Sequence, residues 1–299
     1  MNPSRRSFIQ KLGAASLAVA AGRAGAQQST RKLRKGYMMG TFPDKKLPLL
    51  ERFRMLKETG FDGVEPAISE DPEEVLRARD ATGLQIASMS CGGASRMFAS
   101  ALPPARAKAV DELKAGLRNA KRYGIRSILV VPGVVDEKTT YRQNWDRCTE
   151  CIKACVPVAE EAGVKMAVEN VWNNFLQSPM ECVQFIDQFG TDKVAMHFDI
   201  GNMMSLGWPE QWIEIIGRRI ACIHIKEFSR TKMMEEGKRK GFEVEYLEGD
   251  NDWPAIMQAL RGIDYDGWAI VEPAFRPKDI EIRARLGEIS KRLDKILAS

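Results

Sequence analysis

The strongest constraint on the fold is the alternation of short apolar runs with longer amphipathic stretches along nearly the whole chain. Eight runs rich in β-branched residues are expected to be strands: Gly36–Phe42, Gly63–Ala67, Gln85–Ser90, Ser127–Pro132, Lys165–Val171, Val194–Ile200, Ile220–Lys226 and Trp268–Pro273. A stretch with helical periodicity follows each run: Leu47–Thr59, Pro72–Thr82, Pro103–Tyr123, Asn144–Ala162, Pro179–Phe189, Glu210–Ile216, Trp253–Arg261 and Lys278–Leu297. Such regular alternation is typical of α/β folds with a parallel sheet.

Eight consecutive strand–helix units predict a single (β/α)8 TIM barrel. The alternative, an open doubly wound sheet, would carry a Gly-rich phosphate-binding loop after its first strand, whereas Pro43-Asp44-Lys45-Lys46 stands there. The barrel is expected to occupy residues 27–299 without an internal domain boundary. Its longest interruption, Phe228–Asp252, would lie over the active face, either as a lid or as a solvated surface loop.

Residues 1–26 have the pattern of an export signal. Arg5 and Arg6 precede the apolar run Leu12–Ala21, and Ala24-Gly25-Ala26 has the pattern of a cleavage site. The run is short and rich in alanine, which disfavours a membrane span. The adjacent arginines resemble a twin-arginine signal. We therefore expect the twin-arginine translocase as a partner during export and a periplasmic or otherwise exported protein; the alternative is a frayed basic N-terminus.

The charge of the chain gives no indication of a nucleic-acid partner once the leader is set aside. The formal net charge is +5, and because residues 1–26 carry four basic residues and no acidic residue, the remaining chain carries +1. This balance predicts neither nucleic-acid binding nor stable membrane association.

Three of the six cysteines, Cys148, Cys151 and Cys155, recur at helical spacing. A zinc or redox cluster would use such residues, but the chain has only two histidines and the flanking pattern is helical. The spacing therefore favours thiols that are buried along one face of a helix.

Charged or ionisable residues end several of the predicted strands. Where the carboxyl ends of barrel strands meet, at the active face, the sequence places Glu169, Asp199, His224 and Glu272 on the last four strands and Glu65 on the second. A charge at the end of a buried strand is costly unless it is paired or bound to a metal. Each residue alone could instead cap a helix or pair with a lysine. Together they suit one divalent ion, with Mn²⁺ favoured and Mg²⁺, Co²⁺ or Zn²⁺ as alternatives.

Five segments carry a resemblance to a known family: Val168–Phe175, His197–Asn202, His224–Arg230, Glu248–Trp253 and Gly267–Pro273. On these segments the chain resembles the xylose-isomerase-like TIM-barrel superfamily of sugar phosphate isomerases and epimerases. Within it, the chain is most similar to the ketose 3-epimerase and xylulose-phosphate 3-epimerase branch. The segments are specific for the superfamily and weak on the substrate.

The resemblance implies one divalent metal ion held by Glu169, Asp199, His224 and Glu272, with the two glutamates as the catalytic proton-transfer pair. It also matches Arg230 to an arginine that contacts substrate oxygens. The ketose epimerases carry a histidine three residues after the metal aspartate, where this chain has Asn202. We expect Asn202 to contact the substrate, and the difference weakens a free ketose as the expected substrate. Proton abstraction beside a carbonyl needs a nearby base and a metal that neutralises the enediolate oxygen.

Four further residues are expected around a substrate. His197 faces the same way as Asp199, two residues later, and either lines the pocket or packs in the core. Glu65 is expected to bind a hydroxyl group or to pair with a lysine. Lys226 is expected to stabilise an oxyanion or to hold Glu227 or Glu248. The fourth residue is Trp172. Like Phe175 and Trp208, it could stack on a sugar or serve in packing.

Together these expectations predict a divalent-metal-dependent isomerase or epimerase acting on a sugar or keto-sugar. Export favours an unphosphorylated substrate, because sugar phosphates are mainly cytoplasmic. One alternative is a metal-dependent lyase or dehydratase acting on a keto-sugar or keto-inositol. A phosphodiesterase of this fold would need more histidines, and a non-catalytic sugar-binding barrel would be expected to lack one of the four ligands. The sequence leaves homo-oligomerisation open.

Overall fold

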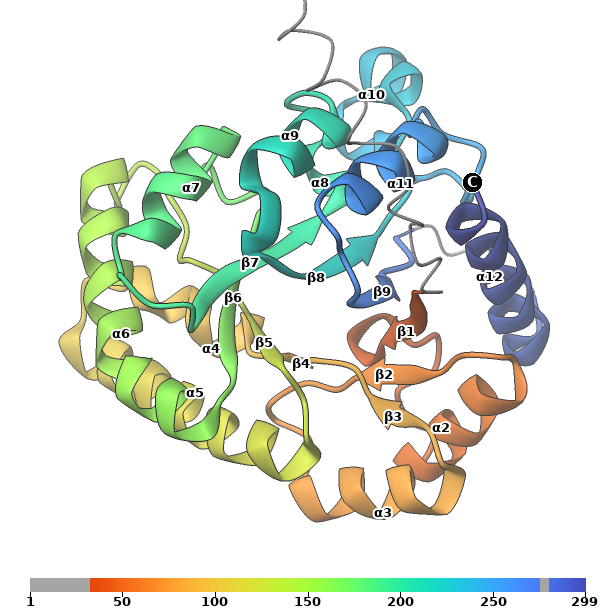
Figure 1. Ribbon diagram of the computed structural model, residues 1–299, viewed down its shortest axis with the longest axis horizontal. Helices are drawn as coiled ribbons and strands as arrows, with labels where there is room; N and C mark the ends of the chain where they lie inside the picture. The colour runs from red at the N-terminus through yellow and green to blue at the C-terminus, as the bar shows by residue number, and fades with distance from the viewer. Residues whose placement is uncertain (1–32, 275–279) are drawn as a thin grey trace, which may run out of the picture. The chain divides into compact units, whose positions relative to one another are not determined.

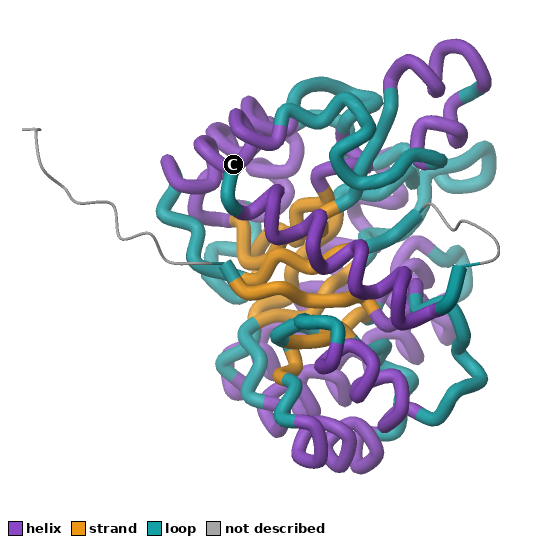
Figure 2. The backbone as a smooth tube through the Cα atoms, turned by 90° about the vertical axis from the view of Figure 1, so that its right-hand side faces the viewer, coloured by secondary structure: helices purple, strands orange, loops and turns teal. Residues whose placement is uncertain are grey.

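The structure, a computed structural model, describes residues 33–274 and 280–299. This part of the chain forms one α/β barrel, with the strands inside and the helices around them (Figures 1 and 2). The prediction of a single TIM barrel is therefore confirmed, while the predicted export signal lies outside the described residues. The strands are β1 (Arg34–Met38), β2 (Gly63–Glu65), β3 (Gln85–Ile86), β4 (Met89–Ser90), β5 (Ser127–Val130), β6 (Lys165–Glu169), β7 (Val194–Asp199), β8 (Ile220–Ile225) and β9 (Trp268–Val271).

All neighbouring strands pair in parallel, in the order β3-β2-β1-β9-β8-β7-β6-β5-β4. The two end strands of this order, β3 and β4, are the two halves of the predicted third strand, Gln85–Ser90, which is interrupted at Ala87 and Ser88. β3 pairs with β2, β4 pairs with β5, and a bridge joins Ala67 to Ser90. The ring therefore closes through this one segment.

A main helix follows each strand position, as predicted. These helices are α2 (Leu49–Glu58), α3 (Pro72–Thr82), α5 (Pro103–Tyr123), α6 (Tyr141–Ala162), α7 (Pro179–Asp187), α9 (Pro209–Ile216), α11 (Trp253–Gly262) and α12 (Ile282–Leu297). Shorter helices interrupt the loops: η1 (Met39–Thr41), α4 (Gly92–Ser95), η2 (Arg96–Ala99), α8 (Ile200–Met203), η3 (Gly217–Arg219), α10 (Arg230–Glu236) and η4 (Lys238–Phe242), where η marks a 3-10 helix. No helix within 33–274 and 280–299 is long and apolar enough to cross a membrane.

The predicted first strand, Gly36–Phe42, begins two residues after the observed strand β1 and ends four residues after it. β1 stops at Met38, because the chain turns there into η1. The hydroxyl group of Thr41 donates to the Met38 carbonyl at 2.8 Å, and the backbone N–H of Phe42 donates to the Met39 carbonyl at 3.2 Å. These local hydrogen bonds replace the strand pairing that the apolar run predicted.

Apolar side chains fill one end of the barrel interior and leave the other end to polar groups. Side chains two residues apart on a strand face the same way, so Trp268, Ile270 and Glu272 follow one another toward the carboxyl end of β9. Two glycines make room for this column. A Cβ at Gly63 would lie 2.6 Å from the Trp268 ring, and a Cβ at Gly36 would lie 2.8 Å from the Ile270 side chain.

The cysteines are buried as predicted. Cys148, Cys151 and Cys155 lie on the buried face of α6, and all six cysteines are free thiols. Burial raises the pKa of the Cys155 thiol to about 12. A thiol with such a pKa is neither a nucleophile nor a metal ligand at neutral pH.

Candidate metal centre

The four predicted metal ligands lie together because their strands are neighbours in the ring. The register pairs Glu169 of β6 with His197 of β7, and Asp199 of β7 with His224 of β8. Glu272 directly follows β9, and its backbone N–H donates to the Ile225 carbonyl at 3.1 Å. Since all these strands are parallel, their carboxyl ends present the four side chains at one face.

The four side chains form a compact set of donor atoms. One ligand atom from each of them lies within 4.8 Å of all the others. His224 Nδ1 lies 3.3 Å from Glu169 Oε1, 3.7 Å from Asp199 Oδ2 and 3.2 Å from Glu272 Oε2. The side chains of His224 and Asp199 are fully buried, whereas that of Glu272 remains 22% exposed. The set is therefore accessible to solvent at Glu272.

Lys226 lies among the carboxylates of this set. Its ammonium nitrogen is 2.8 Å from Asp199 Oδ2 and 2.6 Å from Glu272 Oε2, and it donates a hydrogen bond to Asn202 Oδ1 at 3.1 Å. The carboxylates raise the pKa of Lys226 against the lowering effect of burial, so the ammonium stays charged. Its predicted contact with a substrate oxyanion stays a prediction.

Negative charge exceeds positive charge in this buried region. Among the described residues, four carboxylates face only two groups that can carry positive charge, Lys226 and protonated His224. Buried charges without partners are costly, and a divalent cation bound in place of the proton on His224 Nδ1 would reduce the excess. Three carboxylates and an imidazole nitrogen are suitable donors for such an ion. The residues present therefore fit one divalent metal; the four carboxylates are those of Glu65, Glu169, Asp199 and Glu272.

The surroundings push the pKa values of the two glutamates apart. Burial raises the pKa of Glu169 to about 7, although His224 acts in the opposite direction. Burial also acts to raise the pKa of Glu272, but the charges and hydrogen bonds of Lys226 and His224 hold it well below its usual range. At neutral pH, Glu169 is near its midpoint and Glu272 is ionised. Acids separated in this way can take up and return a proton.

Two asparagines hold Asp199 in place. The Asn170 side chain accepts a hydrogen bond from the Asp199 N–H at 2.8 Å and donates to its carbonyl at 2.8 Å. The backbone N–H of Asn202 donates to Asp199 Oδ1 at 2.7 Å, so Asp199 caps α8 while its other oxygen faces His224. Asn170 was not predicted to belong to the site, although it follows Glu169 at the same strand end.

Both ends of the Asn202 amide make hydrogen bonds within the protein. Its Nδ2 donates to the Asn170 carbonyl at 3.0 Å, and its Oδ1 accepts from Lys226. In this structure Asn202 therefore supports the loop behind Asp199. Its predicted contact with substrate stays a prediction.

Glu65 pairs with a histidine and not with a lysine. It is fully buried, and its Oε1 lies 3.1 Å from His224 Nε2. The prediction of a lysine pair is wrong. Its predicted contact with a substrate hydroxyl group stays a prediction.

His197 is packed against His224. The two rings meet edge to face with their centroids 4.2 Å apart, and His197 is fully buried. Neither of its ring nitrogens has a hydrogen-bond partner among the described residues. Burial lowers the pKa of His197 well below its usual value. The ring is therefore neutral, and its surroundings match the packed-core alternative.

Arg230 contacts the loop that precedes α9. Its Nε donates to the Met204 carbonyl at 3.0 Å, and its Nη2 donates to the Gly207 carbonyl. Its guanidinium group lies 5.0 Å from the centroid of the Trp208 ring. The substrate contact implied by the resemblance stays a prediction.

Trp172 packs beneath the loop that follows β8. Its Nε1 donates to the Asn202 carbonyl at 2.7 Å, and its ring centroid lies 5.9 Å from that of Phe228 and 4.7 Å from that of Phe242. Its predicted contact with a sugar stays a prediction. Phe175, in contrast, is buried between α6 and α7, where it serves in packing.

Glu227 ties the segment Phe228–Asp252 to the end of β8. Its Oε2 accepts hydrogen bonds from Trp253 Nε1 at 2.9 Å and from the backbone N–H of Leu247 at 2.7 Å. Glu248 pairs with an arginine of α12 instead. The prediction that Lys226 holds Glu227 or Glu248 is therefore wrong, because both carboxylates have other partners. Whether Phe228–Asp252 acts as a lid stays a prediction.

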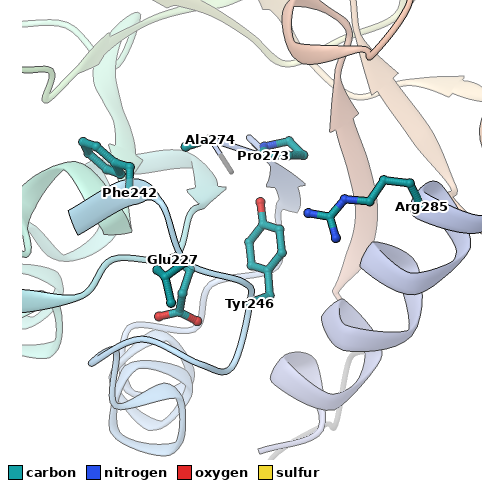
Figure 3. A pocket seen from close by; sticks show the side chains of 7 residues that line it. Glu227, Phe242, Tyr246, Pro273, Ala274 and Arg285 are labelled. Atoms are coloured by element: carbon teal, nitrogen blue, oxygen red, sulfur yellow. The ribbon is translucent and has the colours of Figure 1, made fainter. Parts of the chain in front are cut away.

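A small crevice lies where this segment meets the end of β9 (Figure 3). The Tyr246 hydroxyl group donates to the Ile225 carbonyl at 3.1 Å, and Arg285 reaches from α12 to pair with Glu245 at 2.8 Å. The crevice begins at Pro273, one residue after Glu272. Its lining residues are Glu227, Phe242, Val244, Tyr246, Pro273, Ala274 and Arg285.

Comparison with protein families settles the classification. The profile of the xylose isomerase-like TIM barrel matches residues 53–292, a span that includes all four predicted ligands. The chain belongs to the xylose isomerase-like TIM-barrel family. In this chain, β1 lies before the matched span and completes the ring of strands.

Relatives of this xylose isomerase-like barrel include enzymes of two kinds. The L-ribulose-5-phosphate 3-epimerase UlaE of Escherichia coli (strain SE11) is 26% identical over 239 residues, which cover 75% of this chain and 81% of UlaE. An inosose dehydratase of Clostridium perfringens is 25% identical over 160 residues, or 48% of this chain and 53% of the dehydratase. This match spans about half the length of that relative.

A solved structure shows the same fold over nearly the whole chain. The 3-keto-D-glucoside 4-epimerase YcjR of E. coli has a TM-score of 0.74 and 17% sequence identity, with 90% of this chain and 100% of that chain covered. At this identity the likeness shows the fold alone.

Proposed function

We propose that this protein is a divalent-metal-dependent epimerase or isomerase that acts on a sugar or keto-sugar. The observation that carries this proposal is the position of Glu169 and Glu272 at the His224 imidazole, on strands that lie on opposite sides of β7 and β8. Their pKa values are pushed in opposite directions. Family membership and the sugar-epimerase relative support the same function.

In the proposed site, Glu169, Asp199, His224 and Glu272 would hold the metal ion, which supplies a Lewis acid beside the reacting carbonyl when bound. Ionised Glu272 would accept the proton from carbon. Glu169, on the opposite side of β7 and β8, would deliver a proton to the opposite face of that carbon. In the reverse reaction the two roles exchange. Lys226 holds Asp199 and Glu272 and places a positive charge near the developing oxyanion.

A second candidate is a dehydratase that acts on a keto-sugar or keto-inositol. The similarity to inosose dehydratases favours it. The same base would remove a proton next to a carbonyl, and a hydroxyl group on the neighbouring carbon would leave as water. The two candidates therefore differ in what happens after proton removal.

The substrate that we propose is an unphosphorylated keto-sugar. This choice rests on the export signal expected at residues 1–26, since sugar phosphates are mainly cytoplasmic. The name of the epimerase relative suggests a phosphorylated keto-sugar instead, so both kinds of substrate are to be compared.

Incubation of the Mn²⁺-loaded protein with free and phosphorylated keto-sugars in D₂O tests both candidates. An epimerase or isomerase is expected to give a product of the same composition that carries deuterium at the reacting carbon. An unsaturated or deoxy-keto product would contradict the epimerase proposal and favour the dehydratase. If the loaded protein converts no member of the panel and exchanges no deuterium, the enzymatic proposal is contradicted and a binding role is favoured.

A further inference from the structure

The imidazole of His224 is held from both of its nitrogen atoms. Nδ1 faces the carboxylates of Glu169, Asp199 and Glu272, while Nε2 faces Glu65 Oε1 at 3.1 Å. Glu65 ends β2, three strand positions from β8 in the order of the ring. The closure of the barrel therefore brings together two residues that lie 159 positions apart in the chain.

We propose that Glu65 is a positioning residue for His224: it accepts the Nε2–H and thereby keeps the Nδ1 lone pair free for the metal. A neutral imidazole has one N–H group and one lone pair. If the proton were on Nδ1, the Nε2 lone pair would face a carboxylate oxygen and repel it. The proposal rests on the proposed function, because it concerns the same metal site.

The burial of Glu65 supports this role. The side chain is fully buried, and its second oxygen, Oε2, has no hydrogen-bond partner among the described residues. Its one ion-pair partner in this part of the chain is His224. A carboxylate in such a place costs folding free energy that an apolar side chain would not. Carboxylates that bind the second nitrogen of a metal-ligating histidine orient the ring and increase its basicity.

His197 restricts the same ring from a third direction. Its imidazole meets that of His224 edge to face, with the centroids 4.2 Å apart, and it is fully buried. Packing by His197 limits rotation of the His224 ring, while the hydrogen bond with Glu65 fixes which nitrogen carries the proton.

A second metal ion is the competing interpretation of these residues. Glu65, His197 and His224 offer ligand atoms within 4.8 Å of one another. Such an ion would need the lone pair of His224 Nε2, while the first ion needs that of Nδ1. The ring would then have to lose both protons, so the structure favours a hydrogen bond between Glu65 and His224.

The test compares Glu65→Gln with Glu227→Gln in the full chain. Glutamine keeps the size of the side chain but loses its negative charge, so its amide oxygen accepts the Nε2–H more weakly, and its amide nitrogen can donate to Nε2 and so favour the wrong tautomer. Glu227 is a matched control, because it is also a buried carboxylate at a strand end and hydrogen-bonds to Trp253. We expect Glu65→Gln to weaken Zn²⁺ binding about 10–100-fold, and Glu227→Gln to leave the Kd unchanged.

Nitrogen-15 NMR of the Zn²⁺-loaded protein provides the second measurement, and the chain has only two histidines to assign. We expect a proton bound to Nε2 of His224 in the wild type, and a shifted or faster-exchanging signal in Glu65→Gln. An unchanged Kd and spectrum in Glu65→Gln would overturn the inference and leave the proposed function intact. Two Zn²⁺ ions per chain, one of them lost in this variant, would make Glu65 a ligand instead. If the wild type binds no Zn²⁺, the metal site itself is refuted, and the positioning role with it.

Discussion

Replacement of Glu169 or Glu272 by glutamine is expected to lower kcat by about 10²–10⁴-fold. Glutamine keeps the size of the side chain and one oxygen donor, but it cannot take up the proton from carbon. Because both residues are also expected to hold the metal, the metal content of each variant is measured on the same sample as kcat. The loss of turnover should persist when the ion is bound.

The two glutamine variants should also differ from each other. If the reaction uses both faces of the carbon, Glu169→Gln is expected to wash deuterium from D₂O into the substrate without forming the epimer, because Glu272 is proposed to remove the proton. That partial exchange would identify the glutamate that removes the proton. Near-normal turnover in both variants on a confirmed substrate would contradict the two-carboxylate mechanism.

Replacement of Lys226 by methionine is expected to change stability and metal affinity in opposite directions. The ammonium group neutralises Asp199 and Glu272 at 2.8 and 2.6 Å. Without it, the metal-free protein should lose about 3–5 kcal/mol of stability, because buried carboxylates lose their partner. The same change removes a positive charge that repels the incoming ion, so Mn²⁺ should bind more tightly.

Urea unfolding and calorimetric titration of Lys226→Met measure the two effects. Added Mn²⁺ should restore most of the lost stability, because an ion that binds only the folded state stabilises it. Lys108→Met is the control, since this side chain is 79% exposed on α5 and its replacement should change stability by less than about 0.5 kcal/mol. Unchanged stability together with weaker Mn²⁺ binding would contradict the charge balance described for the site.

The barrel and the convergence of the four candidate ligands could be predicted because both follow from local patterns. The alternation of strands and helices gives the fold, and a charged residue that ends a buried strand indicates a site at the active face. Asp199 shows that a helix cap, the alternative role for each of these residues, does not exclude a place in the site. It caps α8 with one oxygen and faces His224 with the other.

The partners of Glu65 and Lys226 could not be predicted, because they depend on contacts across the ring. Glu65 and His224 meet only through barrel closure, and strand-end spacing gives no information on that distance. Lys226 could reach several carboxylates from the end of β8. It pairs with Asp199 and Glu272 because Glu227 instead accepts a hydrogen bond from Trp253, beyond the loop that follows β8. The end of β1 depended on hydrogen bonds of Thr41 that no periodicity reveals.

Calorimetric titration of the metal-free protein with Mn²⁺ tests the central claim most directly. The site predicts one ion per chain, with binding greatly weakened in Asp199→Asn, a variant that keeps an oxygen to cap α8 but loses the charge beside Lys226. Thermal unfolding of the same variant would verify that the barrel is intact. Binding of one Mn²⁺ ion with equal affinity by both proteins, or no binding by the wild type, would contradict the assignment of the metal site to these residues.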